Sequence, residues 1–267
     1  MSVTFHQQGH VGVITLDDPE AMNALTPEGL MALRRRLREC QDDDGCRVIV
    51  LTGAGDRAFC AGANLKKTFP PERGFARNLL IGRAAEAEDG GYTRLIDLSD
   101  LQIWKPVIAA VNGYCLGGGL ELAMQCDIRL ASTTASFALP EVKVASVPAI
   151  GGVQALLRAI PAAHAMKLAL TGDRIGACDA LNIGLVSDVF EPDALMDGAL
   201  EIAERIARNG PLAVQMVKKL AVETAHLAPA DYIAQSNIAW GLLRDSADRI
   251  EGRTAFGEKR TPHYTGN

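Results

Sequence analysis

The sequence predicts an α/β core followed by a helical region. Over residues 1–191, short apolar runs typical of buried strands alternate with segments of helical periodicity. After Pro192 the strand patterns become few and helical segments follow one another. The chain has 267 residues, 48% of them hydrophobic, so it can bury a large core. We therefore expect a core over residues 1–191 that holds the functional site, and a helical oligomerisation region over residues 192–267.

The composition argues against several classes of partner. A net charge of −5 disfavours nonspecific binding to nucleic acids or anionic membranes. No apolar run approaches the ~18 residues of a membrane span, and no N-terminal signal pattern is present, so we expect a cytoplasmic protein. The six cysteines form no CxxC pair and show no metal-ligand spacing, so reduced thiols and no metal site are expected.

The first part of the chain contains strand patterns on both sides of one helix pattern. Thr26 suits a helix N-cap and Pro27 the first helical position, and leucines at helical spacing continue the helix to about Cys40. Residues 67–99 are the least regular part, and they resemble a mobile wall or lid more than core. The expected strands are residues 3–5, 11–16 and 48–52.

Several signals converge between residues 106 and 127. Residues 106–111 form a buried strand pattern that Asn112-Gly113 ends. Three consecutive glycines at 117–119 predict unusual backbone dihedral angles or the close approach of another group. Residues 120–125 then predict a short helix with Glu121 in its first turn. The N–H groups at a helix start have no helical partner and lie at the positive end of the dipole, so they suit an oxyanion or a phosphate.

The rest of the chain continues this alternation and then becomes helical. Pro140-Glu141 predicts a turn, and the apolar stripes of the terminal helices need a partner surface, which predicts self-association. We expect strands at residues 127–131 and 185–190, a short apolar segment at 135–139, and helices at 153–160, 194–208, 212–226, 230–244 and 246–259.

Two carboxylates are candidates for proton transfer. Glu121 and Glu141 both stand between apolar residues, and burial raises the pKa of a carboxyl toward the range useful at neutral pH. Each also has a simpler interpretation, Glu121 as a favourable first-turn residue and Glu141 as an exposed turn residue.

Cys115 supports a competing hypothesis. Residues 113–117 fit the G-x-C-x-G form of a nucleophile elbow, which would make the chain a thiol hydrolase with a later histidine such as His226 or His263. Both histidines lie in the expected helical region, however, and no HGGG-type segment precedes the motif. A small buried residue is the simpler interpretation of this cysteine.

Over nearly its whole length the chain resembles the enoyl-CoA hydratase/isomerase (crotonase) superfamily, in segments that match in order and spacing: residues 58–66, 105–113, 117–123, 126–127, 137–141, 171–174 and 255–260. The resemblance implies a spiral core of ββα turns and a C-terminal trimerisation region, in a homotrimer or a hexamer built from two trimers. It also implies an acyl-CoA substrate and no separate cofactor, since coenzyme A is part of that substrate.

The resemblance further implies the roles of four residues. The backbone N–H groups of Ala63 and Gly118 would form an oxyanion hole around the thioester carbonyl, where hydration of a 2-enoyl thioester builds enolate charge. Glu121 would hold and deprotonate the water that attacks Cβ, and Glu141 would donate a proton to Cα, with the roles exchanged in dehydration.

Seven residues are expected at coenzyme A on the same basis. Five would line the groove for adenine and pantetheine or lie near a phosphate, and two would reach the site of a neighbouring subunit. The first group is Met22, Ala24, Ala61, Leu65 and Lys66, and the second is Phe256 and Lys259. Solvated surface side chains are the simpler interpretation of the two lysines.

Two positions depart from the family pattern. Asn64 stands where the family often has an acid, and Ala149 follows Pro148 where glycine is usual, which would narrow the acyl group accepted. The expected reaction is the reversible hydration of a 2-enoyl-CoA to a 3-hydroxyacyl-CoA. The alternatives are a carnitinyl-CoA-type dehydratase or an isomerase of the same family, the Cys115 thiol hydrolase, and a non-catalytic relative that binds coenzyme A or RNA.

Overall fold

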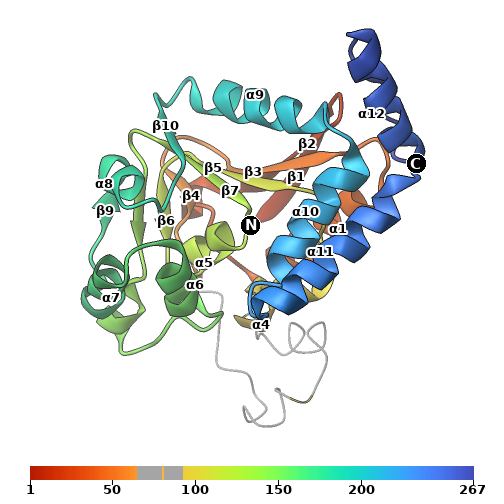
Figure 1. Cartoon of the computed structure of the whole chain (residues 1–267). Helices are drawn as coiled ribbons and strands as arrows, with labels where there is room; N and C mark the ends of the chain where they lie inside the picture. The colour runs from red at the N-terminus through yellow and green to blue at the C-terminus, as the bar shows by residue number, and fades with distance from the viewer. Residues whose placement is uncertain (65–79, 81–92) are drawn as a thin grey trace.

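The computed structural model describes residues 1–64, 80 and 93–267, and within them two β-sheets are surrounded by helices (Figure 1). The large sheet has the strand order β1-β2-β3-β5-β7-β10 and the small sheet the order β4-β6-β8-β9. The large sheet comprises β1 (Ser2–Gln8), β2 (Val11–Asp17), β3 (Val48–Gly53), β5 (Val107–Val111), β7 (Ile128–Ser132) and β10 (Asp188–Phe190). The small sheet comprises β4 (Ala58–Cys60), β6 (Tyr114–Leu116), β8 (Ser136–Ala138) and β9 (Ile175–Gly176).

Successive strands alternate between the two sheets. The chain passes from β3 to β4, from β5 to β6 and from β7 to β8, and each pass moves it one position along both sheets. β1 pairs with β2 and β8 with β9 in antiparallel fashion, while the other paired strands are parallel. Parallel neighbours need a crossover, and the intervening helical segments supply it.

The described helices lie around these sheets, and the C-terminal ones extend beyond them. They are α1 (Pro27–Asp42), α4 (Thr93–Ile96), α5 (Gly118–Met124), α6 (Gly152–Ala159), α7 (Ala162–Thr171), α8 (Ala177–Asn182), α9 (Leu195–Ala207), α10 (Pro211–Glu223), α11 (Pro229–Arg244) and α12 (Ala247–Glu258), with 3-10 turns η1 (Pro19–Ala21), η2 (Ser99–Leu101) and η3 (Pro140–Val144). In the described part of the chain, every helix is too short or too polar to cross a membrane.

The start of α1 follows from its sequence as predicted. The Oγ1 of Thr26 accepts a hydrogen bond from the N–H of Gly29 at 3.1 Å, and Pro27 occupies the first turn. Leu30, Leu33 and Leu37 are buried on one face of this helix, as their spacing requires.

α9 packs against the large sheet. Its buried residues Leu195, Ala199 and Ala203 form one apolar cluster with strand residues that include Val50 and Ile108. The small alanines let the helix approach the sheet closely. By its packing, α9 belongs with the core although it follows residue 192. The boundary between core and helical region at that residue remains a prediction.

The structure differs from the sequence-based expectations at several short segments. β4 and β6 were not expected, the strand predicted at residues 185–190 is shortened to β10, and Pro140-Glu141 opens the 3-10 turn η3. A strand of three residues is too short to show the alternation of apolar and polar residues that predicts a strand. Such strands are recognised only by their pairing, and Cys115 of β6 pairs with both Cys60 and Phe137.

The chain end folds back onto α12 and the core. The Asp248 carboxylate accepts hydrogen bonds from the N–H groups of Thr265 at 2.7 Å and Gly266 at 2.9 Å. The Nη2 of Arg47 donates to the carbonyl of Tyr264 at 2.7 Å. These contacts tie the base of α12 to the core, while the rest of this helix projects from the molecule (Figure 1).

Candidate active site

The glycines at 117–119 form a turn that only glycine can make. Gly117 joins β6 to α5 with φ 53° and ψ −126°, and a Cβ there would lie 2.9 Å from the Oε1 of Glu141. A Cβ on Gly119 would lie 2.2 Å from the carbonyl oxygen of Cys60, so this glycine is required by close packing. The expected unusual backbone is present, and it places the first turn of α5 against β4.

The segment around Ala63 lies beside this turn. The N–H of Leu25 donates to the carbonyl of Gly62 at 2.7 Å, and the N–H of Asn64 donates to the carbonyl of Leu25 at 3.0 Å. A parallel bridge of this kind directs the N–H of Ala63 to the opposite side of its strand. A Cβ on Gly62 would lie 3.4 Å from the backbone nitrogen of Gly118. The two segments predicted to form the oxyanion hole are therefore neighbours.

Glu121 is buried in the first turn of α5, with only 4% of its surface exposed. Its Oε1 accepts hydrogen bonds from the N–H groups of Ile150 at 2.8 Å and Gly152 at 3.0 Å. Burial raises the pKa of this carboxyl, and the backbone N–H donors of residues 149, 150 and 152 oppose part of that rise. A Cβ on Gly152 would lie 3.0 Å from this oxygen, so glycine leaves room for it.

Glu141 approaches the same place from η3. Its Oε2 is buried and has no hydrogen-bond partner among the described residues. Burial is the main cause that raises the pKa of this carboxyl, and the negative charge of Glu121 raises it further. Two carboxyls that repel each other as anions tend to hold different protonation states, which suits one base and one acid.

The glutamates and glycines together form a compact polar site at the start of α5. The space beside Gly117 is taken by the Glu141 carboxyl, Gly118 adjoins Gly62, and Glu121 lies one turn further along the helix. The helix start provides N–H groups without intrahelical partners. Such an arrangement can polarise a carbonyl and move protons at neighbouring atoms.

The expected coenzyme A residues are only partly described. The N–H of Ala61 donates to the carbonyl of Met22 at 3.0 Å, and Met22 is exposed with φ 53°, while Ala24 is buried. These three residues therefore lie on adjoining segments near Ala63. Leu65, Lys66 and most of the expected lid at 67–99 lie outside the described residues.

Phe256 and Lys259 lie elsewhere in the chain. Phe256 is on α12 with 87% of its surface exposed, and Lys259 follows the helix with φ 58°. Figure 1 shows α12 at the upper right of the molecule, away from α5 near its middle. Within one chain, neither residue meets the glutamate pair.

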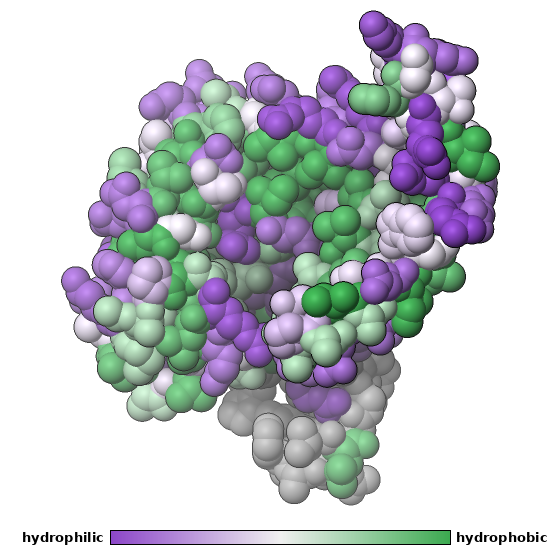
Figure 2. All heavy atoms as spheres, in the orientation of Figure 1, coloured by the Kyte–Doolittle hydropathy of each residue, from purple (hydrophilic) through white to green (hydrophobic). Residues whose placement is uncertain are grey.

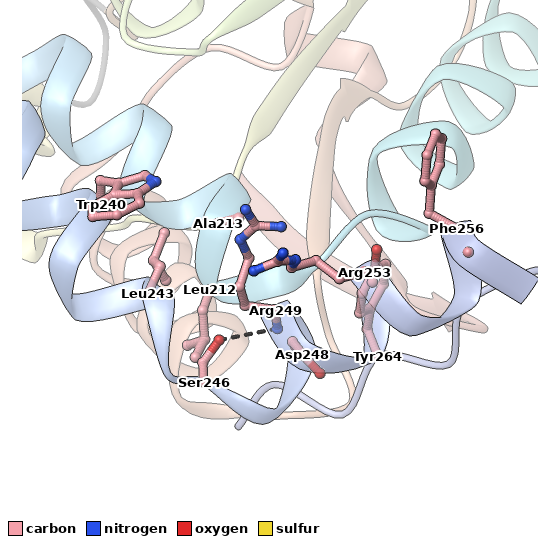
Figure 3. Close-up of a pocket in the computed structure, with 12 residues that line it drawn as sticks. Leu212, Ala213, Trp240, Leu243, Ser246, Asp248, Arg249, Arg253, Phe256 and Tyr264 are labelled. Atoms are coloured by element: carbon pink, nitrogen blue, oxygen red, sulfur yellow. Dashed lines mark hydrogen bonds between the residues drawn. The ribbon is translucent and has the colours of Figure 1, made fainter.

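A groove between the C-terminal helices was not predicted. It has a volume of about 700 Å³ and lies between α10, α11 and α12. Figure 3 shows the side chains of Arg249 and Arg253, both from α12, among the residues that line it. Trp240 and Tyr264 also line the groove, which contains neither of the two glutamates.

The nucleophile-elbow hypothesis for Cys115 is wrong. Its side chain points from β6 into the main hydrophobic core and is fully buried there. Its Sγ is 3.5 Å from the carbonyl oxygen of Gly119. Burial raises the pKa of this thiol, so the reactive thiolate is strongly disfavoured. The glycines around it instead serve the turn into α5.

Sequence reasoning missed the backbone donors that hold Glu121 and the part played by Asn23. The buried Asn23 donates to the carbonyls of Ala54 at 3.0 Å and Ala58 at 2.7 Å, and it accepts from the N–H of Asp18 at 2.9 Å. It therefore joins the residues that follow β2 and β3 to the first residue of β4, beside the Met22 segment. The Gly151-Gly152 pair was a sequence signal that backbone approaches another group closely at this point. A single asparagine such as Asn23 gives no comparable signal.

Comparison with known proteins gives one consistent result. Residues 6–267 match the family model described as enoyl-CoA hydratase/isomerase. The chain is 48% identical to the (E)-benzylidenesuccinyl-CoA hydratase of Thauera aromatica, with 100% of each chain covered. It is 37% identical to the short-chain-enoyl-CoA hydratase of Clostridium acetobutylicum, over 97% of this chain and 95% of that one. The crystal structure of an enoyl-CoA hydratase from Bacillus anthracis superposes with a TM-score of 0.89 at 35% identity, covering 100% of both chains. These matches confirm the predicted fold.

Proposed function

The chain belongs to the enoyl-CoA hydratase/isomerase (crotonase) family as an enzyme of the hydratase type, and from this premise we propose how its residues hydrate a 2-enoyl-CoA. The proposed product is the 3-hydroxyacyl-CoA, and the reaction is reversible. The proposed residues are the N–H groups of Ala63 and Gly118 and the carboxyls of Glu121 and Glu141.

The two N–H groups would bind the thioester carbonyl oxygen. Attack of water at Cβ moves electrons from the double bond toward this oxygen, and a fixed N–H donor there is worth about 3 to 4 kcal/mol in the transition state. The adjacency of Gly62 to the Gly118 nitrogen supports this assignment, as does the start of α5 behind it.

The two glutamates would move the protons. Glu121, as carboxylate, takes a proton from the water whose oxygen bonds to Cβ, and Glu141, as carboxylic acid, gives its proton to Cα. Dehydration reverses both transfers. The single observation that carries this proposal is the meeting of the buried Glu121 and the half-buried Glu141 at the start of α5, each with a raised pKa. An isomerase of the same family needs only one acid, so the pair favours hydration.

The acyl group is proposed from similarity. The identity of 48% to the benzylidenesuccinyl-CoA hydratase exceeds the 37% to the short-chain enzyme, although both cover nearly the whole chain. We therefore place branched aryl 2-enoyl thioesters first among the candidate substrates, ahead of crotonyl-CoA. Ala149, whose N–H is one of the backbone donors to Glu121, is one position that would shape this preference.

The reaction is tested with a panel of thioesters. Crotonyl-CoA, longer straight-chain, branched and aryl-substituted 2-enoyl-CoA thioesters are incubated with the protein, and the loss of conjugated absorbance is followed. Hydration of at least one member with a turnover of about 1 s⁻¹ or more is expected. Failure on every member, together with tight binding of a saturated acyl-CoA, would instead indicate a non-catalytic relative that binds coenzyme A.

The assembly is proposed from the C-terminal helices. Val217, Trp240 and Leu242 are exposed on α10 and α11, and Figure 2 shows hydrophobic side chains at the surface over these helices. Together with the groove in Figure 3, these surfaces fit a homotrimer or a dimer of trimers. Phe256 and Lys259 would then reach coenzyme A in a neighbouring subunit. Met22, Ala24, Ala61, Leu65 and Lys66 would contact it within the same chain.

A further inference from the structure

Gln125 lies at the end of α5 and joins it to the segment that contains α4. Its Nε2 donates hydrogen bonds to the carbonyl of Ile96 at 2.9 Å and to the carbonyl of Glu121 at 3.1 Å. Its Oε1 accepts from the N–H of Leu98 at 2.8 Å. All three partners are backbone groups, so the side chain fixes the course of two segments relative to each other.

The bond to Glu121 replaces a regular helical hydrogen bond. In an α-helix the N–H of residue 125 would donate to the carbonyl of residue 121. Here the N–H of Gln125 donates instead to the carbonyl of Leu122 at 3.2 Å, because the last turn of α5 tightens. The side chain of Gln125 supplies the donor that the Glu121 carbonyl would otherwise receive from the main chain.

The bonds to Ile96 and Leu98 hold the end of α4 in place. Ile96 is the last residue of α4, so its carbonyl has no partner within that helix. Its buried side chain places Cδ1 3.0 Å from where a Cβ would lie on Gly118. The segment held by Gln125 thus packs directly on the first residue of α5.

Arg34 fixes the other side of the same segment. From α1 it donates to the carbonyl of Leu95 at 3.3 Å and to the carbonyl of Asp97, and it pairs with Asp100 at 2.5 Å. These bonds anchor the α4 segment to α1, whereas the hydrogen bonds of Gln125 join it to α5.

We propose that Gln125 is a positioning residue for the hydration reaction. One carboxamide sets α4 against both ends of α5, and through this contact it fixes the N–H of Gly118 relative to the carboxyl of Glu121. The inference rests on the proposed function of these two groups. A small misplacement between such groups lowers the rate because the reacting atoms must meet in a narrow range of distances and angles.

Gln41 offers a matched control. Its Oε1 accepts hydrogen bonds from the N–H groups of Trp104 at 2.8 Å and Lys105 at 3.1 Å, and its Nε2 donates to Gln215 at 3.1 Å. Gln41→Leu and Gln125→Leu therefore each remove three hydrogen bonds made by a half-buried side chain, but only Gln125 bonds to α4 and α5.

The test compares steady-state kinetics on the best thioester, below the melting temperature of each variant. Gln125→Leu is expected to lower kcat roughly 10- to 100-fold relative to Gln41→Leu, with KM changed by less than about threefold. Gln125→Met, which retains the length of the side chain, serves if the leucine variant folds poorly. Equal kcat values for the Gln125 and Gln41 variants would overturn the inference.

A spectroscopic reading separates positioning from general destabilisation. The absorbance of bound 4-(dimethylamino)cinnamoyl-CoA moves to longer wavelength as its carbonyl is polarised by hydrogen bonds. This shift in absorbance should be reduced in Gln125→Leu and retained in Gln41→Leu and in the wild type. An unchanged shift in Gln125→Leu would contradict the inference. A wild-type protein that neither hydrates a thioester nor shifts this absorbance would overturn the proposed function as well, whereas an active wild type with equal variants overturns only the role of Gln125.

Discussion

The glutamate site and the C-terminal helices carry opposite kinds of unfavourable group. At the start of α5 two carboxyls are withdrawn from water, although ionised carboxyls favour exposure. On α10 to α12 apolar side chains such as Trp240, Leu242 and Phe256 are exposed, although they favour burial. The chain's own backbone compensates part of the cost of burying Glu121, because two backbone N–H groups donate hydrogen bonds to its carboxyl. The exposure of the apolar side chains has no such compensation among the contacts described, and a partner surface would relieve it, as the proposed assembly does.

The largest expected effect is on the chemical step. Glu121→Gln and Glu141→Gln should each lower kcat by on the order of 10² to 10⁴ while acyl-CoA binding is retained, because an amide cannot exchange the proton. Turnover is measured by absorbance, and binding by calorimetry with a saturated acyl-CoA. Glu201→Gln changes an exposed glutamate of α9 and should keep wild-type kinetics. Wild-type turnover in both site variants would refute the proposed mechanism.

The next effect concerns association. Leu242→Glu places a charge among the exposed apolar side chains of α11 and should shift the assembly toward monomers, because a charge buried without a partner at an interface costs several kcal/mol. Leu170→Glu on α7 is the matched control, since the two leucines are 69% and 68% exposed. Light scattering after size-exclusion chromatography gives the mass. If both variants retain the wild-type mass, the contact face has been assigned incorrectly.

A smaller effect is expected at Gly117. Gly117→Ala combines a positive φ with a Cβ 2.9 Å from the Oε1 of Glu141, so it should destabilise the fold by about 1 to 3 kcal/mol and displace the acid. Gly184→Ala is the control, because Gly184 also has a positive φ, 81°, but open space surrounds the position of the new Cβ. It measures the cost of a positive φ without a steric contact. Urea unfolding and kcat are measured for both. Equal losses of activity in the two variants would show that the contact with Glu141 is unimportant.

The smallest expected effect is a pH dependence of stability. Burial raises the pKa of Glu141 in the folded state, so the group favours folding most below its unfolded pKa of about 4.3, and this contribution is lost as pH rises through the raised value. The stability of Glu141→Gln relative to wild type should therefore increase from pH 4 toward neutral pH and then level off. Urea unfolding across this range, with Glu201→Gln as control, measures it. A constant difference would indicate that the carboxyl is hydrated in the folded protein.

The sequence by itself determined the fold class and the composition of the site. The cap of α1, the buried strands of the large sheet and the four terminal helices follow from local patterns, because periodicity and cap chemistry act over a few residues. Glu121, Glu141 and the glycines at 117–119 stood out for the same reason. The match of whole segments to a family carried the prediction further, to the pair of N–H groups.

Only the tertiary structure decided which groups meet. The strands β4 and β6 exist because they pair with each other, and the burial of Cys115 that excludes it as a nucleophile follows from that pairing. The hydrogen bonds of Gln125 to the α4 segment and the groove of the C-terminal helices likewise join residues far apart in the chain. Contacts of this kind depend on how elements pack in space, and no short stretch of sequence encodes them.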